Sequence, residues 1–250
     1  MTGFDPKAYW ENHLRNRPGL MATGHRQFSM AYNEAMYQIA TERLQSALTQ
    51  AQIELTGRRI LDVGAGFGYF IQKYLSWGAA RITGVDLAEI SIQELQHTFP
   101  LQEFFRADIS EENLPIPGDY DPESAISMIF HIVDDLRFEQ ALKNMCQRVK
   151  PGGHLIIVDA FHRVWLPTAR HARLRHLGAY QPILRERGLE IRVIYPMYYL
   201  MGQTFIPRIG PLLLNQPGIL RVVMAQERRW GSQSQPKPGW LNFLIAQRQP

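Results

Sequence analysis

The chain holds a single cysteine, Cys146, among its 250 residues. One thiol excludes an internal disulfide framework and a cysteine-rich zinc site. No stretch approaches the roughly 18 consecutive apolar residues of a membrane-spanning helix. The first thirteen residues carry charges and lack an apolar core, so they do not resemble a secretory signal peptide. These absences favour a reducing, cytoplasmic setting and no membrane partner.

The chain also has no strong excess of either positive or negative charge. The 27 basic and 23 acidic residues leave a net charge of +4, whereas nucleic-acid-binding domains usually show a dense basic stripe and a recognisable module. We therefore expect no nucleic acid among the partners. Arginines do gather between residues 163 and 192, and we interpret them as a solvated helix face. The alternative is a rim for an anionic substrate that includes Arg170 and Arg173.

The residues that are present suit a folded α/β domain. Apolar residues make up 45% of the chain and charged residues 20%, which is enough to build a core and excludes wholesale disorder. Three regions differ in pattern: a helical N-terminal part at 1–57, a part at 58–160 in which strands and helices alternate, and a part at 161–250 that is rich in arginine, proline and aromatic residues.

The alternation in the second region predicts a parallel sheet with helices on both faces. The expected strands are 58–63, 81–86, 103–108, 124–130 and 154–160, and the expected helices are 69–77, 89–97 and a third that starts at Asp134 or Asp135 and runs to 149. We expect Leu136 to face inward on this third helix. In the last region we expect a helix that ends near Glu186, a strand at 189–200 interrupted by Pro196, a helix at 219–229 and a closing strand at 240–247 in an edge position, possibly antiparallel.

The N-terminal region divides into two parts. Apolar residues recur at helical spacing from Tyr32 to Gln50, which predicts an amphipathic helix packed on the domain. Residues 5–24 show no clear periodicity, and we interpret them as an arm or lid.

The strongest motif is the glycine loop, which we define as Asp62-Val63-Gly64-Ala65-Gly66-Phe67-Gly68. It follows a strand and opens a helix. Glycines let the backbone turn tightly and approach a ligand, and the helix N-terminus offers free N–H groups to a polar or anionic group. Tyr69 stands where a dinucleotide fingerprint places its third glycine, and no GK[ST] of a P-loop follows. A dinucleotide-dependent oxidoreductase is therefore disfavoured.

Two further acidic residues end neighbouring strands. Asp86 follows the second strand, where a carboxylate can accept both hydroxyl hydrogens of a ribose. Asp108 ends the third strand and can accept a hydrogen bond from the exocyclic amine of adenine. Because the carboxyl ends of parallel strands meet at one sheet edge, these residues and the glycine loop predict an adenosine pocket.

Five segments then resemble the successive motifs of class I S-adenosylmethionine-dependent methyltransferases: ILDVGAGFGYF, GVDLAE, RADI, SAISMIFHIVDD and VKPGGHLIIVD. The resemblance implies a Rossmann-like three-layer sandwich with a seven-stranded, mostly parallel sheet, an antiparallel last strand and an N-terminal helical arm. Residues 58–160 would be the cofactor-binding core, and 161–250 would complete the same domain on the substrate side. The segment FDPKAYWENHLRN and the C-terminal region resemble bacterial small-molecule methyltransferases of secondary metabolism.

The resemblance also implies the cofactor contacts. The three glycines of the loop would lie against the methionyl part of S-adenosylmethionine, whose product is S-adenosylhomocysteine, and Asp62 would lie near its amino group. Asp86 would bind the ribose, and Asp108 would face the adenine amine. The whole expected set is Asp62, Gly64, Ala65, Gly66, Gly68, Asp86, Leu87, Asp108, Ile109 and Phe130.

Fewer residues can be assigned to binding and activating the methyl acceptor. His131 follows the fourth strand and is our candidate general base, with a role in ordering its loop as the alternative. The candidate substrate contacts are Tyr9, Trp10, His162 and Tyr198. We expect no metal site, because Asp134 and Asp159 lack supporting ligands.

The predicted function is methyl transfer from S-adenosylmethionine to an oxygen or nitrogen of a small molecule or short peptide. The [DNS]PP[FYW] tetrapeptide of base-amine methyltransferases is missing after the fourth strand. A nucleic-acid or protein methyltransferase and a non-catalytic cofactor-binding protein remain alternatives, and the oligomeric state stays open.

Overall fold

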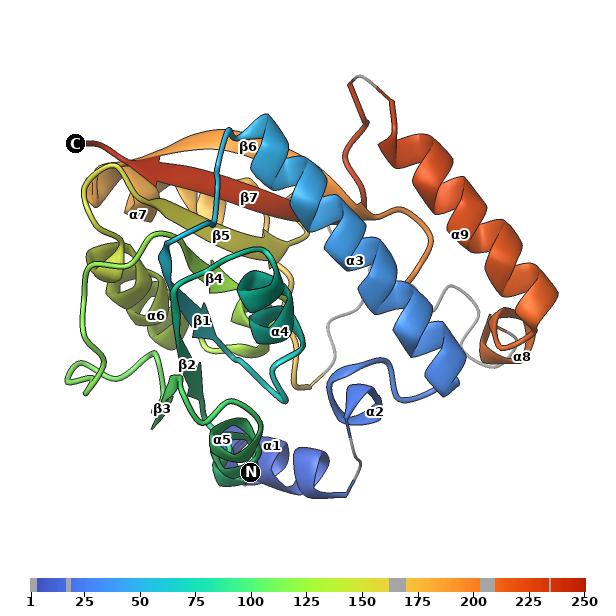
Figure 1. Cartoon of the computed structure of the whole chain (residues 1–250), viewed down its shortest axis with the longest axis horizontal. Helices are drawn as coiled ribbons and strands as arrows, with labels where there is room; N and C mark the ends of the chain where they lie inside the picture. The colour runs from blue at the N-terminus through green and yellow to red at the C-terminus, as the bar shows by residue number, and fades with distance from the viewer. Residues whose placement is uncertain (1–3, 17–18, 162–169, 203–209, 234) are drawn as a thin grey trace.

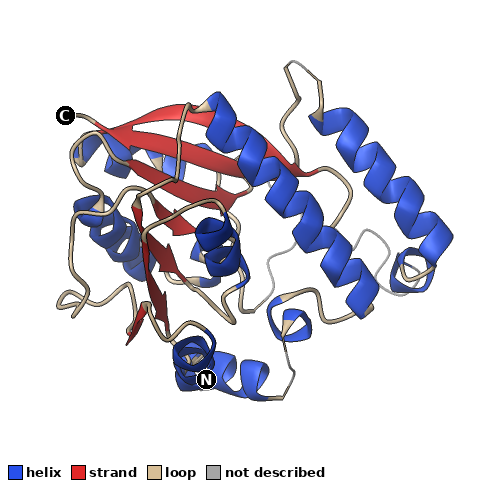
Figure 2. Ribbon diagram, in the orientation of Figure 1, coloured by secondary structure: helices blue, strands red, loops and turns tan. Residues whose placement is uncertain are grey.

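The computed structural model describes residues 4–16, 19–161, 170–202, 210–233 and 235–250. Its centre is a seven-stranded sheet in the order β3-β2-β1-β4-β5-β7-β6, with helices on both faces (Figures 1 and 2). Strands β1 to β5 are parallel, and β7 pairs antiparallel with both of its neighbours. This arrangement confirms the expected fold class. The strands are β1 Arg59–Val63, β2 Arg81–Asp86, β3 Glu103–Arg106, β4 Glu123–Ala125, β5 His154–Asp159, β6 Leu189–Tyr198 and β7 Leu241–Arg248.

The position of β7 corrects the expectation of an edge strand. β7 lies between β5 and β6, and β6 forms the edge. Its first six residues, Leu241 to Ala246, are all buried. Because an internal strand is covered on both faces, it reads as a near-continuous apolar run rather than an alternating one, and LNFLIA has that character.

The fourth strand is shorter than the expected 124–130. It ends at Ala125, and Ser127 has a φ of +56°, a left-handed conformation that a strand cannot contain. A short 3-10 helix, η1 Ile129–His131, follows at once. The chain therefore turns before Phe130, at the carboxyl edge of the sheet.

Two helical layers cover the sheet. One face packs against α3 Met30–Gln50, α4 Tyr69–Ser76 and α5 Glu89–Thr98, and the other face packs against α6 Asp135–Arg148 and α7 Gln181–Glu186. A short 3-10 helix, η2 Leu177–Ala179, precedes α7. Outside α3 lie α8 Gly210–Leu214 and α9 Pro217–Gly231 (Figure 1).

Helix α6 corrects one inward assignment. Asp134 caps the helix by accepting a hydrogen bond from the Arg137 amide at 2.9 Å. Leu136, however, is 78% exposed, and Phe138 is buried instead. Phe138 shares a helical stripe at spacings of three and four with the other buried apolar residues of α6, whereas Leu136 lies off that stripe.

The first helices of the arm lie across the carboxyl edge of the sheet. They are α1 Pro6–Arg15 and α2 Leu20–Thr23. Leu14 and Ala22 form a small apolar cluster with Ala88, which directly precedes α5. Helix α5 has no side-chain cap of its own, and Glu11 of α1 accepts a hydrogen bond from the Glu89 amide at 2.7 Å. The arm thus completes the N-terminus of α5.

Candidate active site

The glycine loop joins β1 to α4 through three left-handed residues. Gly64, Gly66 and Gly68 have φ values of +74°, +54° and +80°. A Cβ atom on Gly64 would collide with Met128, and one on Gly66 would meet Thr23 of α2 at 2.9 Å. Gly68 in turn packs against α5. The loop therefore accepts only glycine for two reasons, the backbone conformation and the close approach of other segments.

Asp86 ties the glycine loop to the start of α5. Its carboxylate accepts hydrogen bonds from the amides of Gly66 and Ala88, both at 2.9 Å. Burial raises the pKa of this carboxyl, although the two amide donors oppose the shift. Each carboxylate oxygen has a second lone pair, so the side chain can also accept ribose hydroxyls. The ribose contact itself stays a prediction.

Asp62 is buried at the carboxyl end of β1. It accepts a hydrogen bond from the Ser124 hydroxyl at 2.8 Å. Burial raises the pKa of Asp62 to about 7, and the neighbouring Asp86 adds to the increase. A cationic amino group beside Asp62 would favour the ionised carboxylate. The arrangement therefore fits the predicted contact with the amino group of the cofactor.

Asp108 lies at a cavity of about 340 Å³ on the same edge. Its carboxylate pairs with Arg137 and accepts a hydrogen bond from the Ser110 amide at 3.0 Å. The cavity is lined by Asp5, Pro6, Lys7, Leu87, Arg106, Ala107, Asp108, Glu111 and Arg137. Arm residues and the predicted adenine contacts thus face one space. Its size suits part of a small ligand.

The remaining predicted cofactor residues lie close to these groups. The Ala65 amide donates to the Val85 carbonyl at 3.0 Å, next to the Gly64 amide. Ile109 is buried in the core beside Asp108. The Phe130 ring lies 4.6 Å from the His131 ring. The structure therefore gathers the predicted set at one sheet edge, while each cofactor contact stays a prediction.

An aromatic cluster covers the edge beside β4. His131 of η1 lies under Trp10 of α1, with ring centroids 4.6 Å apart, and stacks on His171 at 5.6 Å. Tyr9 also stacks on His171, with ring centroids 5.1 Å apart. Three of the predicted acceptor-side residues, Tyr9, Trp10 and His131, therefore come together, although they belong to separate parts of the chain.

His131 is held in one orientation and one protonation state. Its Nδ1 atom lies 2.9 Å from the His171 carbonyl oxygen. Because a carbonyl only accepts, Nδ1 carries the hydrogen and Nε2 carries the free lone pair. Burial is the main cause that lowers the pKa of His131 to about 4. The imidazole is therefore neutral near pH 7, with an Nε2 lone pair whose affinity for a proton is low.

The other two predicted substrate contacts do not join this cluster. The Tyr198 hydroxyl donates to the Met36 carbonyl at 2.9 Å, within the core between α3 and β6. His162 lies outside the described residues. A contact between the acceptor and Tyr198 stays a prediction.

The sequence did not reveal His171, because nothing local distinguishes it. Its segment is tied to η1 and α6: the Arg173 amide donates to the Phe130 carbonyl at 2.7 Å, and Arg173 and Arg175 pair with Asp135. Arg175 is 6% exposed. The interpretation of these arginines as a solvated helix face is therefore wrong for Arg175, which serves as an internal tie.

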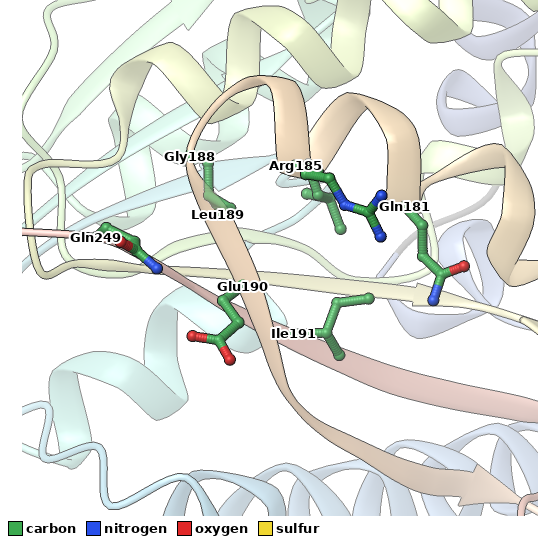
Figure 3. Close-up of a pocket in the computed structure, with 8 residues that line it drawn as sticks. Gln181, Arg185, Gly188, Leu189, Glu190, Ile191 and Gln249 are labelled. Carbon is green, nitrogen blue, oxygen red and sulfur yellow. The ribbon is translucent and has the colours of Figure 1, made fainter.

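A larger cavity, of about 500 Å³, lies at the edge of the sheet formed by the amino ends of the parallel strands, beside β6 (Figure 3). Its wall includes Gly188, Leu189 and Glu190, at the amino end of β6, and Gln249, just after β7. The glycine loop follows the carboxyl end of β1, so this cavity is not part of the candidate active site.

Comparison with known proteins gives a match over the middle of the chain. Residues 60–153 match a family profile described as a methyltransferase domain. A tRNA U34 carboxymethyltransferase of Idiomarina loihiensis is 29% identical over 135 residues, which is 50% of this chain and 41% of that protein. A ubiquinone biosynthesis O-methyltransferase of Neisseria meningitidis serogroup C is 25% identical over 177 residues, which is 61% of this chain and 72% of that protein. The chain spans about two fifths of the first relative's length.

Solved structures share the fold at low identity. Magnesium protoporphyrin IX methyltransferase from Synechocystis PCC 6803 with bound S-adenosylmethionine covers 99% of both chains, with a TM-score of 0.61 and 14% identity. An S-adenosylmethionine-dependent methyltransferase from Mesorhizobium loti covers 81% of this chain and 96% of its own, with a TM-score of 0.55 and 20% identity.

These comparisons correct one expectation about partners. We expected no nucleic acid, but several matching relatives are tRNA U34 carboxymethyltransferases. A mild net charge is weak ground for that exclusion, because net charge averages over the whole surface and says little about one local face.

One negative finding concerns membranes. In the part of the chain that the structure describes, no helix has the length and apolar character to span a bilayer. Over residues 60–153 the chain matches a methyltransferase-domain profile, and the glycine loop and the order of the strands agree with the fold of solved methyltransferases that bind S-adenosylmethionine.

Proposed function

We propose that the protein transfers a methyl group from S-adenosylmethionine to a hydroxyl oxygen of a small molecule bound beneath α1. The same reaction with a nitrogen atom as the methyl acceptor is the alternative form of this proposal. The observation that carries the proposal is the neutral His131, whose Nε2 lone pair is left free by the contact between Nδ1 and the His171 carbonyl. The acceptor hydroxyl loses its proton as its oxygen forms a bond to carbon, and the Nε2 lone pair can accept that proton. Because the low pKa makes this imidazole a weak base, the proposal suits an acidic hydroxyl, such as that of a phenol, better than an aliphatic alcohol.

The chain's own residues perform the remaining tasks. Bound S-adenosylmethionine supplies a methyl group on a sulfonium, so that one C–S bond breaks as one C–O bond forms. Asp62 and Asp86 hold the ligand at the sheet edge, and alignment of the two reactants supplies much of the rate. Tyr9 and Trp10 cover the site and exclude water. His131 Nε2 takes the proton that the acceptor hydroxyl loses.

The test is release of S-adenosylhomocysteine with a panel of hydroxylated aromatic and apolar small molecules, using wild type and His131→Asn. We expect the variant to lose about a hundredfold or more in kcat. Thermal stabilisation by S-adenosylhomocysteine should be unchanged, which separates catalysis from cofactor binding. Full turnover by His131→Asn would remove the base from the mechanism.

A nucleoside in tRNA is the second candidate acceptor. The matches to tRNA U34 carboxymethyltransferases support it, and the exposed Arg170 adjoins His171 in the chain. Retention of bulk tRNA at low salt, with a steep loss as salt increases, would favour this candidate. The double change Arg170→Glu/Arg173→Glu should then weaken retention, whereas a small-molecule enzyme would retain no tRNA at physiological salt.

A further inference from the structure

Helices α8 and α9 carry an apolar surface that faces outward. Leu212 is 73% exposed and Val222 is 69% exposed, and three more large apolar residues of α3, α8 and α9 are also exposed. We define the α8–α9 patch as Met30, Leu212, Leu213, Ile219 and Val222. Met30 begins α3. The preceding Ser29 amide donates to Asn215, in the turn between α8 and α9, at 2.7 Å, so the start of α3 lies against that turn.

The opposite side of α9 is fastened to the domain. Leu220 is buried in the core cluster that also contains α3. The buried carboxylate of Glu227 accepts hydrogen bonds from three consecutive amides after β6, those of Tyr199, Leu200 and Met201. These contacts fix α9 in its place outside α3 (Figure 1). The patch is therefore a stable outer face and not the inner face of a loosely held helix.

The first half of α9 is apolar on both sides. Leu220, Val223 and Met224 face the core cluster, while Ile219 and Val222 face outward. A helix that is apolar all round is typical of a buried environment. A contiguous exposed apolar surface on a soluble domain usually marks an interaction site.

The exposed charged residues of α9 are arginines, whereas Glu34, one turn after Met30 on α3, is an exposed acidic residue. Arg221 is exposed and lies between Ile219 and Val222 in the chain, and Arg229 is exposed further along α9. Glu227 is the acidic residue within α8 and α9, and its carboxylate is buried among backbone amides. Arg228 pairs with Glu42 of α3 at 2.7 Å. Positive charge next to projecting leucines is typical of surfaces that bind anionic lipid headgroups.

We propose that the α8–α9 patch docks on a membrane surface that contains anionic lipids. Leu212, Leu213 and Val222 would enter the boundary between headgroups and acyl chains, and Arg221 would contact lipid phosphates. This proposal does not depend on the methyl acceptor, and it departs from the sequence-based expectation of no membrane partner.

Two other occupants fit less well. A nucleic acid binds through arginines and does not require exposed leucines around them. A second copy of the chain, joined about a twofold axis through the same patch, would place Arg221 and Arg229 of both copies in one interface, and α8 and α9 offer no exposed acidic residue to pair with them. The combination of exposed apolar side chains and the exposed arginines of α9 favours a lipid surface.

The experiment is vesicle flotation of the whole protein. Vesicles of phosphatidylcholine alone are compared with vesicles that also contain phosphatidylglycerol. Leu212→Ser/Leu213→Ser removes two leucines of the patch. The matched control, Leu101→Ser/Leu136→Ser, removes two leucines that are 88% and 78% exposed elsewhere. Arg221→Gln tests the electrostatic part.

We expect wild type and the control to float with the anionic vesicles. The patch variant should show an affinity at least about tenfold lower, because a buried leucine contributes more than that factor. Arg221→Gln should weaken binding mainly at low salt. Cofactor-dependent thermal stabilisation, measured for each variant, reports that the domain is folded.

Three results would overturn the proposal. The first is a wild type that does not bind either vesicle type. The second is equal binding by the patch variant and the control. The third is a dimer in light scattering that Leu212→Ser/Leu213→Ser dissociates while wild type fails to bind vesicles, which would assign the patch to a second copy.

Discussion

The Nδ1 atom of His131 lies 2.9 Å from the carbonyl oxygen of His171, a residue 40 positions later in the chain. The hydrogen bond reaches the backbone of residue 171 and does not involve its imidazole. A change of the His171 side chain therefore removes ring stacking but leaves the carbonyl that orients His131.

This distinction predicts different effects for the two histidines. His171→Ala should lower kcat by less than about tenfold, since stacking contributes little beyond area. His131→Ala should lower it by about a hundredfold or more, because the proton acceptor is lost. Single-turnover rates measured with saturating cofactor would show the difference. Equal losses in the two variants would mean that stacking, and not proton transfer, is the main contribution.

The low pKa of His131 predicts a flat pH profile for catalysis. Burial lowers this pKa to about 4, so the imidazole is neutral from about pH 5 upward and its capacity as a base does not change there. The kcat should therefore fall only as pH decreases toward 4. A loss of kcat around pH 6.5, the ordinary range of histidine, would contradict the buried, neutral imidazole.

Asp62 predicts pH dependence of cofactor binding. Burial raises its pKa to about 7, and the polar groups that face it include Asp86, the Ser124 hydroxyl and the Tyr74 hydroxyl. Below that pH the carboxyl is protonated and attracts the cofactor's amino group less. The Kd for S-adenosylhomocysteine should therefore rise as pH falls from about 8 to 6, by at most about tenfold per pH unit.

Calorimetric titration of Asp62→Asn provides the matched control. The amide has nearly the same shape and does not ionise, so the variant should bind weakly and with little pH dependence over this range. A wild-type Kd that does not vary with pH would exclude the raised pKa or the contact with the amino group.

The buried Glu123 predicts that the free energy of unfolding declines as pH rises above the ordinary pKa of a glutamate. It is fully buried beside Cys146 of α6, and burial raises its pKa well above the ordinary value. The folded state then binds a proton that the unfolded state releases, so the stability due to this group is fully present below the unfolded pKa. It declines as pH rises, by about 1.4 kcal/mol per unit up to the folded pKa.

The variant Glu123→Gln tests this relation by thermal unfolding. The difference in Tm between the variant and wild type should be small near pH 5 and should grow in favour of the variant toward pH 8. A constant difference across that range would show that Glu123 does not hold a proton in the folded protein.

The contact of Glu11 with α5 predicts that the arm affects cofactor binding through the segment that follows Asp86. Glu11 accepts the Glu89 amide at the start of α5, directly after Leu87 and Ala88. Glu11→Ala should increase hydrogen exchange of the α1 amides and weaken binding of S-adenosylhomocysteine, with a loss typical of a helix cap, about 1 kcal/mol. Glu139→Ala, which breaks a half-buried pair with Lys143 on α6, is the matched control and should change neither.

Local patterns were sufficient for much of this protein. The strand before the glycine loop, the left-handed glycines and the strand-end residue Asp86 could be predicted because each depends on neighbours in the chain. Capping by Asp134 is local for the same reason. Alternation of strands and helices also restricts the connections, so the parallel part of the sheet follows from element order.

The tertiary structure decided what depends on distant segments. Insertion of β7 between β5 and β6 cannot be inferred from the order of the elements, because either edge could receive the last strand. Three contacts join segments far apart in the chain. They are the contact between His131 and His171, the cap that Glu11 provides for α5, and the pair of the buried Arg175 with Asp135. Periodicity reports which face of an element is apolar, but only packing shows which partner covers that face. For the same reason, only the folded arrangement reveals that the outer face of α8 and α9 has no partner among the described residues.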